Sequence, residues 1–262
     1  MAVPEAASGS THEGPDWHGL YNKLRDTTNS ITQTIKILME IEEEASGYPP
    51  NETTLRTQLV NQLLVVMEQH PEVVAIQLST LECLAKLMAS SNCPTTSLLS
   101  AVVSAMSRYP HHATLQATAC SVLCQIDLES LDPDDPKTRE ELPAPDDIAC
   151  ALVAAARHHG NVELQILALH TSTTFIRAQM IDNPYPSMLT RIGLCEATVA
   201  AMDAHKACLD LQLAGMQAIL SLTRAAFHII DVDVPSRLQS SGAHGTTLRA
   251  MRWHTSNKQV GG

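Results

Sequence analysis

Apolar residues recur at steps of three and four positions along most of the chain, the spacing of one face of an α-helix. The pattern begins at Trp17 and predicts an amphipathic helix over residues 16–46. We interpret this helix as an N-terminal cap that covers the first of the repeated units that follow it; a partner-binding or coiled-coil helix is the alternative. Residues 1–15 are small, polar and acidic, so they predict a disordered leader.

The same spacing then predicts four pairs of helices, each pair joined by a short turn. Pro71 and Pro110 end the first helix of the first two pairs, because proline cannot continue the backbone hydrogen bonds of a helix. Each pair has two apolar faces and cannot bury both alone, so stacked neighbours must complete the core. The sequence therefore predicts an all-α, right-handed solenoid of about four helical-pair repeats. The repeats lie within 53–230 and span about 53–92, 95–128, 146–178 and 192–226.

Each predicted pair also contains an aliphatic residue followed by glutamine, with a ring-bearing residue seven positions earlier. The glutamines are 39, 49 and 47 residues apart, and a period of roughly 40 to 50 residues indicates a helical solenoid. They could form a ladder that binds an extended peptide. Alternatively, each could bond a backbone group at its own turn, with its side-chain carbonyl accepting from an unpaired N–H at the start of the second helix. Their constant distance from the turn favours the structural role. The four glutamines are Gln77, Gln116, Gln165 and Gln212, and the rings are His70, Tyr109, His158 and His205.

Two segments interrupt this pattern. Residues 127–147 contain four prolines and many carboxylates, and they predict a solvated acidic loop. After about Val234 the helical spacing fades, so 234–262 predicts a disordered tail. No polar capping helix is then expected after the fourth pair, and residues such as Phe227 would remain partly uncovered. This suggests a fragment or short variant of a longer protein.

Composition narrows the range of partners. Aromatic residues make up only 3% of the chain, too few for a base-stacking surface, and the net charge is −11 with no run of Lys or Arg. Both features disfavour nucleic acid and anionic membranes as partners. No apolar stretch reaches the length of a membrane span, and the first ten residues do not form a signal peptide. The seven cysteines, odd in number and without a CxxC pair, indicate reduced thiols in a cytoplasmic protein.

The sequence contains no recognisable catalytic signature. Phosphate-loop, dinucleotide-binding, zinc-protease, hydrolase and kinase motifs are all missing. Cys120 and Cys124 share a helix face, but no second pair completes a metal site, so we interpret them as core residues. The stretch from His170 to Thr174 is unusually polar for a helix and predicts either a peptide groove or a solvated face. We therefore expect no enzyme activity, metal or cofactor.

The pattern Met-x-x-His followed by glutamine seven positions later, as at Met67, His70 and Gln77, resembles the repeats of the armadillo/HEAT superfamily. The resemblance covers about residues 53–226. This part of the chain is similar to the armadillo segments of three groups of proteins. They are the Zyg/Zer substrate receptors of cullin–RING ubiquitin ligases, the leucine-rich-repeat kinases and the serine/threonine kinase-like (pseudokinase) proteins. The chain lacks the Trp-x-x-x-Asn ladder of nuclear-import armadillo proteins, since Trp17 and Trp253 both lie outside the repeats.

These observations predict a non-enzymatic scaffold or adaptor that binds a partner protein or peptide on the surface formed by the second helices. The candidate binding residues are polar positions on otherwise apolar helices: Gln125, His170, Thr174 and Gln217. The resemblance leaves two alternatives, a regulatory armadillo segment of a larger serine/threonine kinase-like protein and the substrate-receptor part of a cullin–RING ubiquitin ligase. An enzyme with an unrecognised site remains a further possibility and would need a cleft with perturbed titratable groups.

Overall fold

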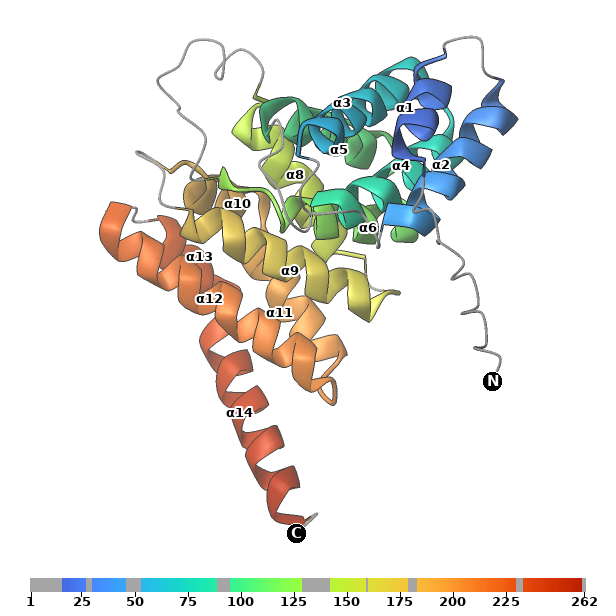
Figure 1. Cartoon of the computed structure of the whole chain (residues 1–262). Coiled ribbons are helices and arrows are strands. Elements are labelled where there is room, and N and C mark those ends of the chain that lie inside the picture. The colour runs from blue at the N-terminus through green and yellow to red at the C-terminus, as the bar shows by residue number, and fades with distance from the viewer. Residues whose placement is uncertain are drawn as a thin grey trace, which may run out of the picture.

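The described residues form helices joined by turns, with no β-strand among them, so this part of the chain is all-α as predicted (Figure 1). The predicted leader and most of the predicted acidic loop lie outside the described residues. The computed structural model describes residues 16–26, 30–45, 53–88, 95–128, 142–158, 160–178, 183–229 and 233–260.

The region predicted as one N-terminal helix is divided into two, α1 (Trp17–Arg25) and α2 (Ile31–Ala45). Helix α1 ends where Asp26 adopts an extended backbone. On the other side of the break, the Ser30 hydroxyl accepts a hydrogen bond from the Gln33 amide at 3.3 Å. Short polar side chains such as these compete for backbone hydrogen bonds and disfavour a helix interior. The prediction of a single helix over residues 16–46 was therefore wrong, because the spacing of the apolar residues continues through this break and does not reveal it.

A helix pair matches each of the four ranges proposed from the sequence, although α8 begins one residue before its range and α12 ends three residues after its range. The first helix of each pair is α3 (Thr53–Gln69), α5 (Thr95–Arg108), α8 (Pro145–Ala156) or α11 (Leu194–Ala204). The second is α4 (Val74–Leu87), α6 (Ala113–Leu123), α9 (Val162–Arg177) or α12 (Leu209–Ile229). A helix that the sequence did not indicate, α10 (Tyr185–Ile192), precedes α11 and ends at Gly193, whose φ of 108° is left-handed.

The second helices pack in chain order. Helix α2 contacts α4, α4 contacts α6, α6 contacts α9, and α9 contacts α12; we call these five helices the second-helix row. A parallel series of contacts joins α1 to α3, α3 to α5 and α5 to α8. An apolar core that extends from Trp17 to Val234 joins these two series of helices. Figure 1 places α1 and α2 at one end of the molecule and α12 at the other.

The tail predicted to be disordered is helical from residue 233 to residue 260. Helix α13 (Asp233–Ser240) packs against α10 and α12, and α14 (Ala243–Val260) packs against α11 and α12. Figure 1 shows α14 leaving the body of the molecule toward the C-terminus. Between residues 243 and 255, the buried positions of α14 are the small residues Ala243, Thr246 and Ala250. Small residues give little apolar periodicity, which is why the prediction of a disordered tail was wrong.

Candidate functional site

The four repeated glutamines are buried and connect the two helices of their own pair. The side-chain nitrogen Nε2 of Gln77 donates to the carbonyl oxygen of Met67 at 2.8 Å and to that of His70 at 3.1 Å. Gln116 makes the same two bonds to Met106 and Tyr109, at 2.7 and 3.0 Å. Each acceptor lies at or just after the end of a first helix, where backbone carbonyls lack intrahelical partners.

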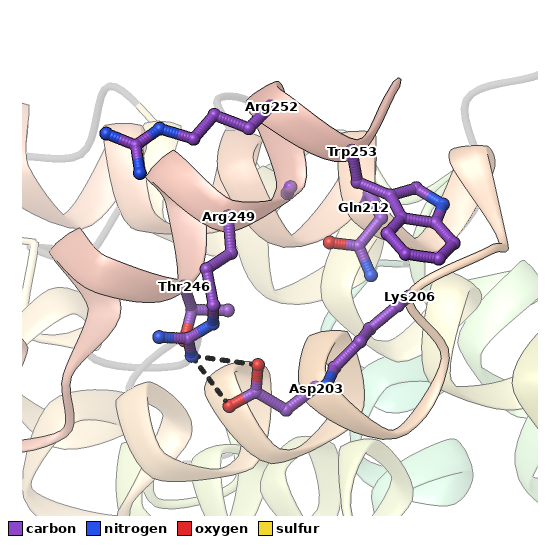
Figure 2. Close-up of a pocket in the computed structure, with 8 residues that line it drawn as sticks. Asp203, Lys206, Gln212, Thr246, Arg249, Arg252 and Trp253 are labelled. Atoms are coloured by element: carbon purple, nitrogen blue, oxygen red, sulfur yellow. Dashed lines mark hydrogen bonds and ion pairs between the residues drawn. The ribbon is translucent and has the colours of Figure 1, made fainter. Parts of the chain in front are cut away.

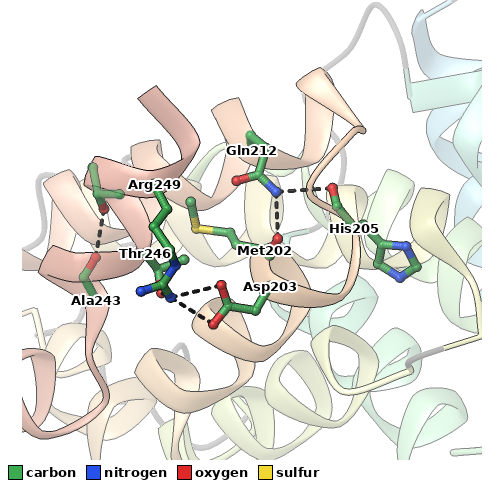
Figure 3. A network of polar contacts seen from close by, with 8 residues as sticks. Met202, Asp203, His205, Gln212, Ala243, Thr246 and Arg249 are labelled. Atoms are coloured by element: carbon green, nitrogen blue, oxygen red, sulfur yellow. Dashed lines mark hydrogen bonds and ion pairs between the residues drawn. The ribbon is translucent and has the colours of Figure 1, made fainter. Parts of the chain in front are cut away.

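The fourth pair repeats this geometry and the third varies it. Gln212 Nε2 donates to Met202 O at 2.7 Å and to His205 O at 3.1 Å, as Figure 3 shows. Gln165 Nε2 donates to Ala156 O at 3.2 Å. The structural role expected of the glutamines is therefore observed, but through a different group. The amide nitrogen closes the end of the first helix, whereas we had expected the amide oxygen to accept from the start of the second.

Three of the four predicted binding residues meet at one cavity of about 460 Å³. His170 and Thr174 come from α9, and Gln217 comes from α12. His170 and Gln217 are each five residues after a repeated glutamine, so the packing of α9 on α12 brings equivalent positions together. The remaining lining residues are Ile126, Asp127, Leu128, Thr173, Arg177 and Ala178.

The fourth predicted residue, Gln125, does not line this cavity. Helix α6 ends at Leu123, so Gln125 lies beyond the helix and is exposed. Its side-chain nitrogen donates to the carbonyl oxygens of Ala85 and Ser121, each at 3.2 Å. The residue therefore links α6 to the neighbouring α4, while the three residues that follow it supply one wall of the cavity.

The polar stretch of α9 beside His170 is mostly internal. Thr171, Ser172 and Thr173 are buried, and each hydroxyl donates to the carbonyl four residues earlier, at 2.8 Å in all three cases. Serine and threonine inside a helix commonly bond the carbonyl four residues earlier in this way. Of the stretch after His170, only Thr174 is partly exposed, so these residues do not form the solvated face considered above.

Cys120 is a buried core residue and Cys124 is half-buried at the α6–α9 contact. Thr171 Oγ1 lies 3.0 Å from Cys124 Sγ and donates to Cys120 O at 3.1 Å. Burial raises the pKa of the Cys120 thiol to about 12, so the thiol is protonated near neutral pH. Among the described residues, no three His, Cys, Asp or Glu side chains come together as metal ligands would.

A second cavity, of about 480 Å³, lies where α14 packs beside the turn between α11 and α12 (Figure 2). Three cations line it, Lys206, Arg249 and Arg252, together with the ring of Trp253. Arg249 is held by the Asp203 carboxylate, with contacts of 2.9 and 3.0 Å, and donates to Thr246 Oγ1 at 2.7 Å (Figure 3). Sequence reasoning missed this cavity because it treated α14 as disordered.

The fold and the two cavities define the class only broadly, as an all-helical protein of paired helices. Comparison with protein-family models, with curated proteins and with solved structures finds no match. In the part of the chain that the structure describes, no helix combines the length and apolar character of a membrane span.

Proposed function

We propose that the chain is an armadillo/HEAT-like solenoid that serves as a non-enzymatic scaffold or adaptor and binds an extended segment of a partner protein. The observation that carries the proposal is the cavity in which His170, Thr174 and Gln217 converge from two neighbouring second helices. Solenoids present extended surfaces to which each repeat contributes a few side chains. The successive contacts of the second-helix row support such a surface.

The chemistry of the cavity suits a polypeptide backbone. The Gln217 amide and the His170 imidazole supply both donors and acceptors, which an extended peptide needs at alternating positions. Arg177 and Asp127 add one charge of each sign at the cavity lining, and Ile126 and Leu128 add buried apolar surface beneath it. We therefore propose a peptide with a polar backbone contact and at least one apolar side chain, and no cofactor or metal.

The state of the cysteines supports a cytoplasmic setting for this role. Cys83, Cys120, Cys124, Cys150, Cys195 and Cys208 are free thiols. Free thiols, half of them buried in this case, are typical of proteins kept in a reducing compartment.

Selection from a random-peptide display library tests the proposal directly. Peptides that bind the native protein are retested by calorimetry against a triple variant, His170→Ala with Thr174→Val and Gln217→Ala. We expect affinity to fall at least about tenfold, since each lost polar contact in a binding site costs about 1 kcal/mol. Gln125→Ala is the matched control, because Gln125 is polar and exposed but lies outside the cavity. Peptides that bind the triple variant and the native protein equally would place binding elsewhere.

A further inference from the structure

Helix α12, the last member of the second-helix row, has an apolar stripe that no described residue covers. Leu209, Leu213, Leu220 and Phe227 are all exposed. At about 100° per residue they fall within about 40° of one another on the helix. Phe227 is 83% exposed and Leu213 is 51% exposed. Contiguous apolar surface of this kind marks an interaction site in a soluble protein.

The surroundings of this stripe are basic. Arg224 is exposed beside the stripe, and Lys206 and Arg252 line the cavity at α14 with Trp253 (Figure 2). Residues 235–262 contain four basic residues and no Asp or Glu, although the whole chain has a net charge of −11. Arg249 and Arg237 are paired with Asp203 and Glu196, and Asp210 is exposed on α12, so the basic character of this end rests on Lys206, Arg224 and Arg252. We call α12 and α14 with this stripe the C-terminal end face.

The opposite end of the row has the complementary character. Helix α2, its first member, exposes Met39 at 59% and Ile31 at 47%. Glu43 is exposed one turn after Met39, and Glu44 is exposed farther round the helix. Glu43 and Glu44 line a hollow of about 250 Å³ between α1 and α2, together with Asp16, Gly19, Leu20, Lys23 and Glu40. We call α1 and α2 with these residues the N-terminal end face.

We propose that the C-terminal end face binds the N-terminal end face of a second copy of this chain, so that copies associate head to tail. In such a contact α2 of one copy packs beside α12 of the next, as α12 packs beside α9 within one chain. The basic groups Lys206, Arg224 and Arg252 then lie opposite Glu43 and Glu44, and the exposed apolar side chains of both helices become buried. Complementary charges set the orientation of such an interface and speed its formation.

The two faces are different surfaces, so the contact is heterologous and each added copy presents a new free end. Assembly then grows with protein concentration and does not stop at a dimer. This feature separates the proposal from an isologous dimer, in which α12 of one copy would meet α12 of the other. The contact does not require the peptide site, because the apolar stripe and α2 include none of His170, Thr174 and Gln217, although Gln217 also lies on α12.

Sedimentation velocity with two complementary double variants of the full chain tests the proposal. The first, Leu213→Glu with Leu220→Glu, disables the C-terminal end face. The second, Met39→Lys with Glu43→Lys, disables the N-terminal end face. Val65→Glu, an exposed apolar position on α3, is the control for adding a charge elsewhere. Circular dichroism and thermal unfolding of each variant establish that it is folded.

We expect the native protein and Val65→Glu to form species that enlarge with concentration, while each double variant alone is monomeric. An equimolar mixture of the two double variants should form a dimer and nothing larger, because only one pair of competent faces remains. Raising the ionic strength from about 0.1 M to about 1 M shortens the screening length from about 10 Å to about 3 Å and should weaken association of the native protein about tenfold.

Three results would overturn the proposal: a native protein that stays monomeric at its solubility limit, a mixture that stays monomeric, or a double variant that alone still associates. The last result would indicate an isologous contact or another interface. Capture of an unrelated acidic protein by the C-terminal end face, without self-association, would likewise count against it.

Discussion

The side-chain nitrogen of Gln116 lies 2.7 Å from the carbonyl oxygen of Met106, ten residues earlier in the chain. The same separation of ten residues joins Gln77 to Met67 and Gln212 to Met202. A buried side chain near the start of each second helix thereby supplies the donors that the end of the first helix lacks. Because an unpaired buried carbonyl costs about as much as a lost hydrogen bond, this contact stabilises the end of the first helix.

Replacing Gln116 with leucine tests the contact, because leucine has a similar size but no donor. Two carbonyls, those of Met106 and Tyr109, would lose their partner. We expect the free energy of unfolding to fall by about 2 kcal/mol or more, measured by urea denaturation. Gln217→Leu, at an exposed glutamine on another second helix, should change it by less than about 0.5 kcal/mol. Equal effects of the two substitutions would show that the buried contact contributes nothing specific.

The helix pairs were readable from the sequence because large aliphatic residues mark their buried faces. Leu59 and Leu63 in α3, or Leu81 and Leu84 in α4, are fully buried and follow the helical spacing. The structural role of the repeated glutamine was equally predictable, since its distance from the turn is constant. The carbonyl groups to which it donates were not predictable, because spacing shows where a side chain lies and not which backbone group it bonds.

The C-terminal end face could not be predicted because its contacts use small residues. Ala250 of α14 packs against Ala201, Met202 and Leu211 of α11 and α12. An alanine contributes little to an apolar stripe, so the sequence of α14 does not show its buried face.

The peptide cavity was predicted in part. His170 and Gln217 occupy equivalent positions on adjacent helices, but the end of α6 at Leu123 displaces Gln125 from the place that periodicity assigns to it.

The buried thiols predict a pH dependence of stability. Burial raises the pKa of Cys83 and Cys120 to about 12 and that of Cys195 to about 11, from an ordinary value of 9.0. Above pH 9 the unfolded chain loses thiol protons that the folded chain keeps, so the free energy of unfolding should fall as pH rises. Each such thiol contributes a slope of up to about 1.4 kcal/mol per pH unit.

Urea denaturation between pH 7 and pH 10, on the native protein and on Cys120→Ala, measures this dependence. The variant should lose part of the slope, whereas Cys150→Ala, at an exposed cysteine, should keep the native slope. Alkylation followed by mass spectrometry gives a second readout. Cys150 should react in the folded protein, and Cys83, Cys120 and Cys195 only after unfolding. Rapid alkylation of Cys120 at neutral pH would contradict the assigned burial.

Docking of α14 on α11 predicts a local effect at Ala250. A glutamate there would force a larger side chain with a charged end into the apolar contact with Ala201, Met202 and Leu211. We expect Ala250→Glu to detach α14 while the helix pairs remain folded. Hydrogen exchange of the amides in residues 243–255 should accelerate at least about tenfold, which corresponds to about 1.4 kcal/mol. The neighbouring exposed residue provides the control: Met251→Glu should leave this exchange nearly unchanged.

Gly193, at the junction of α10 and α11, predicts the clearest backbone effect. Its φ of 108° is a conformation that residues with a β-carbon rarely adopt, and a β-carbon there would lie 2.4 Å from Arg157 Nη2. That nitrogen donates to Ile192 O at 2.9 Å, so Gly193→Ala would combine backbone strain with displacement of this hydrogen bond. We expect a loss of about 1–2 kcal/mol in the free energy of unfolding, measured by urea denaturation. Gly160→Ala is the matched control, since a β-carbon there meets no atom within 4 Å. Alanine at Gly160 should be neutral or stabilising by up to about 1 kcal/mol, because it restricts the unfolded chain. If Gly193→Ala were as stable as Gly160→Ala, the left-handed junction that orients α11 against α10 would have to be wrong.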